Sequence, residues 1–201
     1  MQLPLLRLVS LLGLLSGATA HGLVQNPPTR SPGDATAAAC GKTMANFYKA
    51  DNTSYPEALL RANPGGLKDG YNAKNCNLWL CKGYQFGDNK AGVQQYVGGQ
   101  EVVYKYANVS VVDTTTNSAI GSPLLAWPSG YAASSNPPKN HTDFKVKIPD
   151  NLGGRCSQAG VCVLQWYWFG QAQTYESCTD FVVPEVTAAA DSPIRKREWW
   201  A

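Results

Sequence analysis

The chain has 201 residues, of which 44% are hydrophobic and 15% charged, and its 17 basic and 14 acidic side chains give a net charge of +3. This balance excludes a disordered polyelectrolyte and leaves no electrostatic basis for binding nucleic acid. The 19 Gly, 13 Pro, 6 Trp, 10 Tyr and 5 Phe favour short strands joined by long structured loops over a helical bundle. We therefore expect one all-β domain.

Residues 1–20 have the three parts of a secretory signal peptide. Arg7 precedes an apolar run, and small residues follow, ending in the A-x-A cleavage pattern Ala18-Thr19-Ala20. The run is shorter than the roughly 20 apolar residues that a membrane span needs. We predict cleavage after this pattern and a secreted, extracellular protein that does not insert in a membrane. The mature chain would begin at His21.

The mature chain is expected to open with a short strand that ends at Pro27 and Pro28. Residues 31–92 are rich in Gly, Asn, Pro and Lys, and this composition predicts a long loop excursion with one short helix over 55–62. Loops of this kind often carry binding surfaces.

Strand patterns become stronger from residue 100 onward. Alternating or continuous runs of β-branched and aromatic residues predict strands over 101–106, 109–112, 144–149, 160–169 and 178–183. The fourth run is almost wholly apolar, as in a strand buried on both faces. Short strands separated by turn signals predict a two-sheet β-sandwich over 21–184. The tail, 185–201, lacks periodicity, and we expect it to be disordered.

Six cysteines, an even number in a secreted chain, predict three disulfides. Sequence spacing favours two short loops and one long closure, which pair Cys76 with Cys81, Cys156 with Cys162, and Cys40 with Cys178. A zinc cluster is the alternative, but no C-x-x-C pair occurs. Three sequons provide candidate glycosylation sites at Asn52, Asn108 and Asn140.

The sequence contains two histidines, His21 and His141. At a free amino terminus, the α-amine and ring Nδ1 of His21 would form a six-membered chelate on a metal ion. His141 lies in a polar loop before a predicted strand, so both residues can also be ordinary surface histidines. If both bind one ion, the three nitrogens suit Cu(II), whereas a zinc site favours a third protein side chain and a tetrahedral cage.

A second motif contains Gln173, Tyr175 and Cys178. Residues two apart on a strand share a face, so Gln173 and Tyr175 would point together while Cys178 faces the other way. The phenol would fill a weak axial position, and the amide would orient an oxygen species beside the metal. The alternative for Tyr175 is a core tyrosine with a satisfied hydroxyl.

These motifs in combination resemble the lytic polysaccharide monooxygenases. The resemblance is carried by mature His21-Gly22, by Asn140-His141-Thr142-Asp143-Phe144, by the aromatic run 164–168, and by Gln173-Thr174-Tyr175-Glu176-Ser177-Cys178. The opening run 21–30 with Ala39-Cys40-Gly41 and the Gln-x-Tyr motif is most similar to the fungal auxiliary-activity family sixteen. The similarity spans about residues 21–184.

The resemblance implies an immunoglobulin-like (fibronectin III-like) β-sandwich with long disulfide-pinned loops. It implies one copper ion per chain, held in a histidine brace by His21 and His141, with Tyr175 as the axial group and Gln173 near the oxygen species. The implied reaction is oxidation of β-1,4-glucan, typically cellulose, at C1 with O₂ or H₂O₂. The expected partners are this polysaccharide and an external electron donor, and we expect a monomer.

A crystalline polymer requires a flat aromatic face, for which the loop candidates are Phe47, Tyr48, Tyr55, Tyr71, Trp79, Tyr131 and Asn136. A glycan on Asn140 would crowd this face. Two alternatives to the enzyme remain open. One is a non-catalytic copper-binding protein on the same scaffold, which would not need Gln173 with Tyr175. The other is a disulfide-stapled carbohydrate-binding or wall protein with incidental histidines.

Overall fold

The computed structural model describes residues 22–104, 108–127, 131, 136–152, 154–170 and 172–185. The predicted signal peptide, His21, and all of the predicted tail beyond residue 185 lie outside these residues. Over the ranges described, none of the helices combines the length and apolar character needed to cross a membrane.

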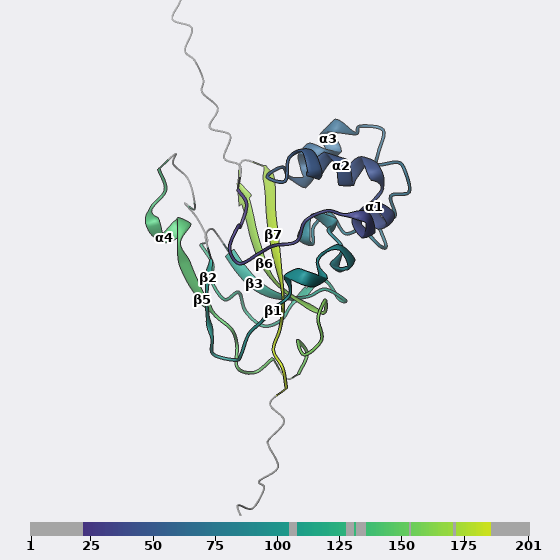
Figure 1. The fold of residues 1–201 in the computed structure, drawn as a ribbon. Coiled ribbons are helices and arrows are strands. Elements are labelled where there is room, and N and C mark those ends of the chain that lie inside the picture. Colours follow the sequence, from purple (N-terminus) through teal and green to yellow (C-terminus); the bar gives the residue numbers. More distant parts are fainter. Residues whose placement is uncertain are drawn as a thin grey trace, which may run out of the picture.

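Two sheets form the framework of the fold (Figure 1). The larger has the strand order β1-β7-β6-β3-β4, with bounds Gln94–Gln95, Gln173–Val182, Cys162–Gly170, Asn108–Asp113 and Ser118–Ala119. The smaller pairs β2 (Glu101–Tyr104) with β5 (Phe144–Lys147). Neighbouring strands run antiparallel except β1 and β7, which are parallel. The sheet-rich framework predicted from the sequence is confirmed.

The two sheets share one hydrophobic core. Alternation along β5 buries Phe144 and Val146 and exposes the lysines between and after them. Opposite them, Leu164 and Trp166 of β6 are completely buried in the same cluster. Side chains on a strand alternate between its two faces, so the residues of β6 next to Leu164 and Trp166 face the other side of the larger sheet.

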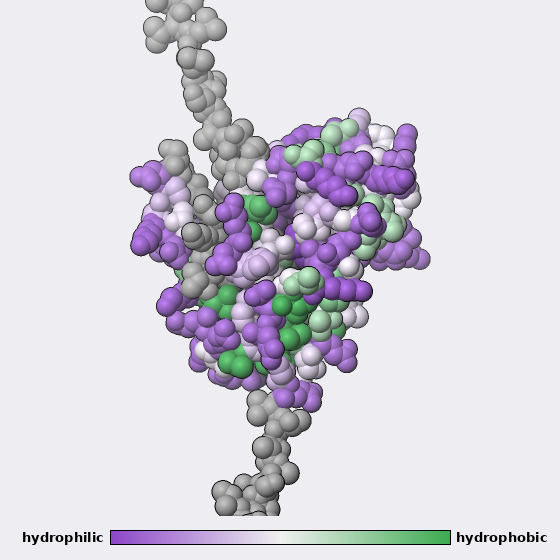
Figure 2. Space-filling view, viewed as in Figure 1, coloured by the Kyte–Doolittle hydropathy of each residue, from purple (hydrophilic) through white to green (hydrophobic). Residues whose placement is uncertain are grey.

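Three helices cover that other side: α1 (Asp34–Cys40), α2 (Lys42–Ala50) and α3 (Pro56–Ala62). Figure 1 shows them on the opposite side of β6 and β7 from β2 and β5. Three single-turn 3₁₀ helices, η1 (Cys81–Gly83), η2 (Phe86–Asp88) and η3 (Lys90–Gly92), connect them to β1. The space-filling view shows mostly hydrophilic residues over the helical region, with hydrophobic residues gathered toward the opposite end (Figure 2).

The helix expected over 55–62 is confirmed as α3, which has Pro56 at its start and Glu57 in its first turn, as helix N-termini favour. Residues of α1 and α2, expected as loop, form helices instead. The start of α1 is capped from a distant segment, because the Asp88 carboxylate accepts hydrogen bonds from the amides of Gly33 (2.9 Å), Ala35 (2.8 Å) and Thr36 (2.8 Å). No local sequence pattern carries that capping interaction.

The opening strand predicted for the mature chain is wrong. Residues 22–33 contain no strand, although they run beside β7. Val24 donates its amide hydrogen to Ser177 Oγ at 3.3 Å, and Arg30 donates its amide hydrogen to the carbonyl oxygen of Cys178 at 2.8 Å. The two prolines between these contacts have no amide hydrogen, so the segment cannot form a continuous ladder with β7.

The three predicted disulfides are present in number, but two predicted pairings are wrong. The observed pairs are Cys40 with Cys76, Cys81 with Cys178, and Cys156 with Cys162. Only the last was predicted; the pairs Cys40 with Cys178 and Cys76 with Cys81 do not occur. Cys40 ends α1 inside the helical cluster together with Cys76, whereas Cys81 packs against β7 with Cys178. The number of residues between two cysteines does not reveal which part of the fold each cysteine packs against.

Strand β6 is not buried on both faces along its whole length, as the sequence led us to expect. Cys162, Val163 and Leu164 are fully buried, because core residues cover one face and helical residues the other. Toward the end of the strand, Tyr167 is 38% exposed and Phe169 is 60% exposed. The outer face of the sheet is therefore uncovered there.

Candidate metal centre

Aromatic rings gather where β6 turns into β7. In this hairpin Trp168 is the direct partner of Tyr175, and Gly170 is the partner of Gln173. The Trp168 indole stacks on the Tyr175 ring, with centroids 5.1 Å apart and an interplanar angle of 20°. Both side chains point to the core side, whereas Cys178 packs on the helical side with Leu80 and Cys81. The predicted facing of Tyr175 and Cys178 is confirmed.

Gly22, the first described residue, lies on the same indoles. A Cβ atom at Gly22 would stand 3.1 Å from Cη2 of Trp166 and 4.0 Å from Cε3 of Trp168. A larger residue would therefore push against the Trp166 ring. His21 itself lies outside the described residues. Gly22 directly follows the predicted mature terminus.

His141 reaches this region from another segment. The structure places it in α4 (Lys139–Thr142), a single helical turn where the sequence predicted a polar loop. Its ring stacks on Tyr131, with centroids 5.0 Å apart, and meets Trp127 edge-on at 5.5 Å. The Tyr131 hydroxyl donates a hydrogen bond to the His141 carbonyl oxygen at 2.7 Å. Tyr131 also contacts Trp168 at 5.9 Å, so a continuous set of rings joins His141 to Tyr175.

Tyr175 is 1% exposed, and its hydroxyl donates a hydrogen bond to Oε1 of Gln173. Burial raises the pKa of Tyr175 to about 12, with a further contribution from neighbouring Tyr55. The phenol therefore keeps its proton at neutral pH. The core environment considered as an alternative and the predicted shared face with Gln173 occur together in this structure, and the hydrogen bond between the two side chains was not predicted.

The donor set can be tested against the ion that the sequence predicts. Within the described ranges, no three His, Cys, Asp or Glu residues form a group able to hold a metal. The predicted set differs in kind, because it uses the amine and ring of His21, the ring of His141 and the neutral phenol of Tyr175. Nitrogen donors with one weak oxygen suit copper better than zinc or calcium. Of this set the structure describes His141 and Tyr175, whose nitrogen and oxygen donors are of the kinds that copper binds.

The candidates for a flat sugar-binding face divide into two groups. Tyr48 (0% exposed), Tyr55 (7%) and Tyr131 (8%) are buried, so they pack in the interior, and their assignment as sugar-stacking residues is wrong. Trp79 is 47% exposed and Asn136 is also exposed, whereas Phe47 and Tyr71 are half-buried. Asn140, the sequon residue beside His141, is exposed on α4.

Trp127 and Trp168 are the residues that sequence reasoning missed. The sequence predicts a strand over Trp168, but it does not show that this indole joins the two candidate motifs. Strand alternation with Tyr175 on the neighbouring strand was the signal that could have found it. Trp127 lies outside any predicted element, and no sequence pattern linked it to His141.

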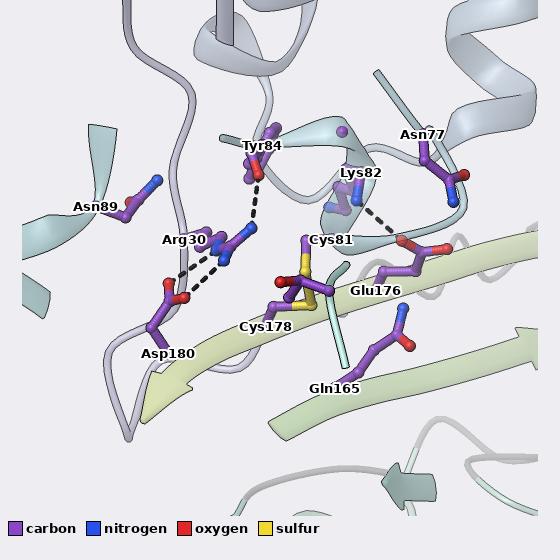
Figure 3. Close-up of a disulfide and its surroundings, with 12 residues drawn as sticks. Arg30, Asn77, Cys81, Lys82, Tyr84, Asn89, Gln165, Glu176, Cys178 and Asp180 are labelled. Carbon is purple, nitrogen blue, oxygen red and sulfur yellow. Dashed lines mark hydrogen bonds and ion pairs between the residues drawn. A yellow bond between two sulfur atoms is a disulfide. The ribbon is translucent and has the colours of Figure 1, made fainter. Parts of the chain in front are cut away.

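A buried polar layer lies on the opposite face of β7 (Figure 3). The Lys82 amide donates a hydrogen bond to Oε2 of Glu176 at 2.9 Å, and Lys82 Nζ donates one to the Asn52 carbonyl oxygen at 2.7 Å. Burial raises the pKa of Glu176 to about 8 and lowers the pKa of Lys82 to about 8. Further along the strand, Arg30 forms two hydrogen bonds with the Asp180 carboxylate, at 2.6 and 2.8 Å.

The candidate centre and the cavity near Val183 lie at opposite ends of β7. A cavity of about 640 Å³ lies beside Leu152, Cys156 and Val183, next to the end of β7. Gln173 begins that strand, and ten extended residues separate the two places by about 30 Å.

Comparison with known proteins does not name a family. The chain matches no protein-family model and has no significant match among curated proteins. The functional argument therefore depends on the residues and their arrangement.

Proposed function

We propose that this chain is a secreted, copper-dependent lytic polysaccharide monooxygenase that cleaves β-1,4-glucan, with cellulose oxidised at C1 by O₂ or H₂O₂ and an external electron donor. The observation that supports it is the ring system of Trp168, which contacts Tyr175 on one side and Tyr131, the partner of His141, on another. A Cβ atom at Gly22 would stand 4.0 Å from this indole and 3.1 Å from that of Trp166. Three parts of the chain that are distant in sequence, namely Gly22, the segment from Tyr131 to His141, and the β6–β7 hairpin, thus meet at one end of the larger sheet.

The finer fold assignment belongs to the same proposal. Two sheets that share one core, with helices and 3₁₀ turns pinned by disulfides on one side, are compatible with an immunoglobulin-like β-sandwich. The three disulfides also favour an oxidising compartment. Together with the signal sequence, they support export to the extracellular space.

In this proposal His21, through its amine and ring, and His141 hold the copper ion beside Tyr175. When bound, copper supplies the one-electron chemistry that activates O₂ or H₂O₂ toward a strong C–H bond. The role of the other residues in this proposal is to position these ligands. Tyr131 fixes α4 through the carbonyl oxygen of His141 and stacks on its imidazole.

Gln173 has a positioning role at the other side of the centre. Its Oε1 accepts the Tyr175 hydroxyl hydrogen, so the phenol proton points to the amide and the oxygen lone pairs remain available to a weak ligand bond. The same contact fixes the amide plane, which leaves Nε2 as a donor at the edge of the site. With copper bound, that donor would be available to hydrogen-bond the co-substrate.

The decisive experiment is product analysis after incubation with cellulose, copper and ascorbate. Aldonic-acid oligosaccharides are expected from the mature protein. His141→Ala and a variant with one glycine ahead of His21 should each form at least about 100-fold less product, because each removes a metal nitrogen. Lys139→Ala, an exposed change in the same helical turn, is the matched control and should retain activity.

Copper binding separates the enzyme from its alternatives. Titration of the metal-free protein should show tight binding that weakens as pH falls, since amine and imidazole nitrogens must lose protons to bind. Electron paramagnetic resonance should show nitrogen couplings that the glycine extension alters. Tight binding without oxidised sugars would indicate a non-catalytic copper protein. Retention of activity by the extended variant would rule out the histidine brace.

A further inference from the structure

Tyr167 and Phe169 form an exposed aromatic pair on the outer face of β6. The side chains of Tyr167 and Phe169 are 38% and 60% exposed, whereas Trp166, which faces the core, is fully buried. The pair lies near the end of β6, and the helical residues cover only the neighbouring strand at this level, because the partners Glu176 and Thr174 in β7 are buried. Exposed neighbouring aromatic rings on a regular strand usually meet a partner.

The strand register places a sequon beside this pair. Asn108 of β3 is the direct antiparallel partner of Tyr167, and Ser110, the third sequon residue, is the partner of Gln165. Directly opposed residues share a face of the sheet, with Cβ atoms about 5 Å apart. Val109 points into the core between them and is completely buried. Both Asn108 and Ser110 are therefore on the outer face with Tyr167.

The side chain of Asn108 is held in one orientation. Its Oδ1 accepts a hydrogen bond from the Trp127 amide at 2.7 Å. In a planar amide, Nδ2 lies on the other side from that contact, and Nδ2 is the atom to which an N-linked sugar is attached. Glycosylation keeps Oδ1 as an acceptor, so the hydrogen bond to Trp127 is compatible with the modification.

We propose that Asn108 carries an N-linked glycan whose first sugars lie over Tyr167 and Phe169. In the attachment step, sugar C1 of a lipid-diphosphate-linked oligosaccharide forms a bond to Nδ2. The bond from C1 to the diphosphate oxygen breaks, an amide proton is lost, and the lipid diphosphate leaves. The apolar face of a pyranose covers an aromatic ring in the way that aromatic side chains cover one another. The glycan thus protects the uncovered end of the sheet from water.

The other two sequons lack this arrangement. Asn52 lies between α2 and α3, and Asn140 lies in α4, so neither has a cross-strand aromatic partner. Asn52 is exposed and serves as the matched control. The proposal depends on passage through the secretory pathway but not on copper, so failure of the proposed enzyme activity would not affect it.

The first test is glycopeptide mass spectrometry of the protein secreted from a eukaryotic host. Asn108 is expected to be occupied, and Ser110→Ala, which destroys the sequon without changing Asn108, should remove that glycan alone. An Asn108 peptide without sugar would overturn the proposal. If the serine variant is poorly secreted, enzymatic removal of the whole glycan from the folded wild-type protein, which leaves an aspartate in place of Asn108, provides the same comparison.

The second test measures coupling between the sugar and the rings. Loss of the glycan through Ser110→Ala should lower Tm by about 2–4 °C, the shift that a modest stabilising contact produces in a chain of this size. In a Phe169→Ala background the same change should have little further effect, since the contact is already lost. Asn52→Gln should leave Tm unchanged in both backgrounds.

Three outcomes would contradict the stacked glycan. Additive Tm shifts for Ser110→Ala and Phe169→Ala would show that the sugar does not touch the ring. A dimer of the glycosylated protein that Phe169→Ala dissociates would assign the face to a second copy. Weaker cellulose binding by Phe169→Ala with an unchanged Tm would assign it to the polymer.

Discussion

The Trp168 indole of β6 stacks on the Tyr175 ring of β7 at a centroid distance of 5.1 Å, and the same indole meets the other two parts of the candidate metal centre. Tyr131 meets the same indole at 5.9 Å. Gly22 lies within 4.0 Å of it, when measured from an added Cβ atom. A single side chain thus contacts three segments that are far apart in the sequence.

Replacement of this indole should destabilise the fold more than removal of the neighbouring hydroxyl. We expect Trp168→Ala to lower the free energy of unfolding by about 3 kcal/mol, because it creates a cavity among Gly22, Tyr131 and Tyr175. Tyr175→Phe keeps the stacked ring and loses one hydrogen bond to Gln173, so its cost should be about 1 kcal/mol. Urea unfolding of the metal-free variants measures both values, and equal losses would contradict the central position of Trp168.

Glu176 should make the protein less stable as the pH rises from about 5 to 8. Burial raises its pKa from 4.5 to about 8, so the native state keeps a proton that the unfolded state releases in this interval. Stability is therefore greatest below the unfolded pKa and falls as pH rises through the native pKa. Lys82, whose pKa burial lowers to about 8, stays protonated over most of the same interval.

Glu176→Gln tests this pH dependence directly. Glutamine retains an oxygen that can accept the Lys82 amide hydrogen but does not titrate. Urea unfolding of metal-free protein between pH 5 and 8 should show a smaller decline for the variant than for the wild type. The histidines contribute equally to both proteins, so the comparison cancels them. Parallel pH profiles would show that Glu176 is ionised in the native state.

Local sequence patterns predicted the strands of the sheet, because the signal for a strand is contained in a few consecutive residues. Val109 and Val111, like Phe144 and Val146, alternate inward along their strands, and period-two alternation follows directly from strand geometry. The helix over Pro56–Ala62 was also predictable, since its start carries proline and an acidic residue. These features need no knowledge of distant segments.

The parts that could not be predicted depend on tertiary contacts. Asp88 caps α1 from across the chain, and its hydrogen bonds to Thr36 join segments 52 residues apart. Cys81 pairs with Cys178 because η1 packs on β7, which loop length does not reveal. In the candidate centre, Gln173 and Tyr175 were identified by strand alternation, whereas the rings of Trp127 and Trp168 became evident only in the folded chain.

The buried ion pair between Arg30 and Asp180 should be far more important for stability than an exposed one. Arg30 also donates a hydrogen bond to the Tyr84 carbonyl oxygen at 3.0 Å, so it holds the opening segment against both β7 and the helical region. Asp180→Asn leaves the guanidinium without its charge partner, and we expect a loss of about 3–5 kcal/mol.

The pair of Lys145 with Glu101 provides the control for that prediction. Their side chains are 61% and 63% exposed, and the N to O distance is 3.1 Å. Glu101→Gln should cost less than about 1 kcal/mol, because water screens the pair. Guanidinium chloride would itself screen charges, so urea is the suitable denaturant. If the two variants lose similar free energies of unfolding, burial does not make the pair of Arg30 with Asp180 more important for stability than the exposed pair.

The disulfides should contribute differently to the free energy of unfolding, according to the length of the loop that each one closes. Cys81 and Cys178 are 97 residues apart, whereas Cys156 and Cys162 are 6 apart. In the chain-entropy model, removal of the first pair should cost about 4–5 kcal/mol and removal of the second about 2 kcal/mol, because a longer loop gains more freedom in the unfolded chain. Double alanine variants at each pair, unfolded in urea, measure the difference. A larger loss at Cys156 and Cys162 would show that native-state packing around the short loop outweighs the entropy of the unfolded chain.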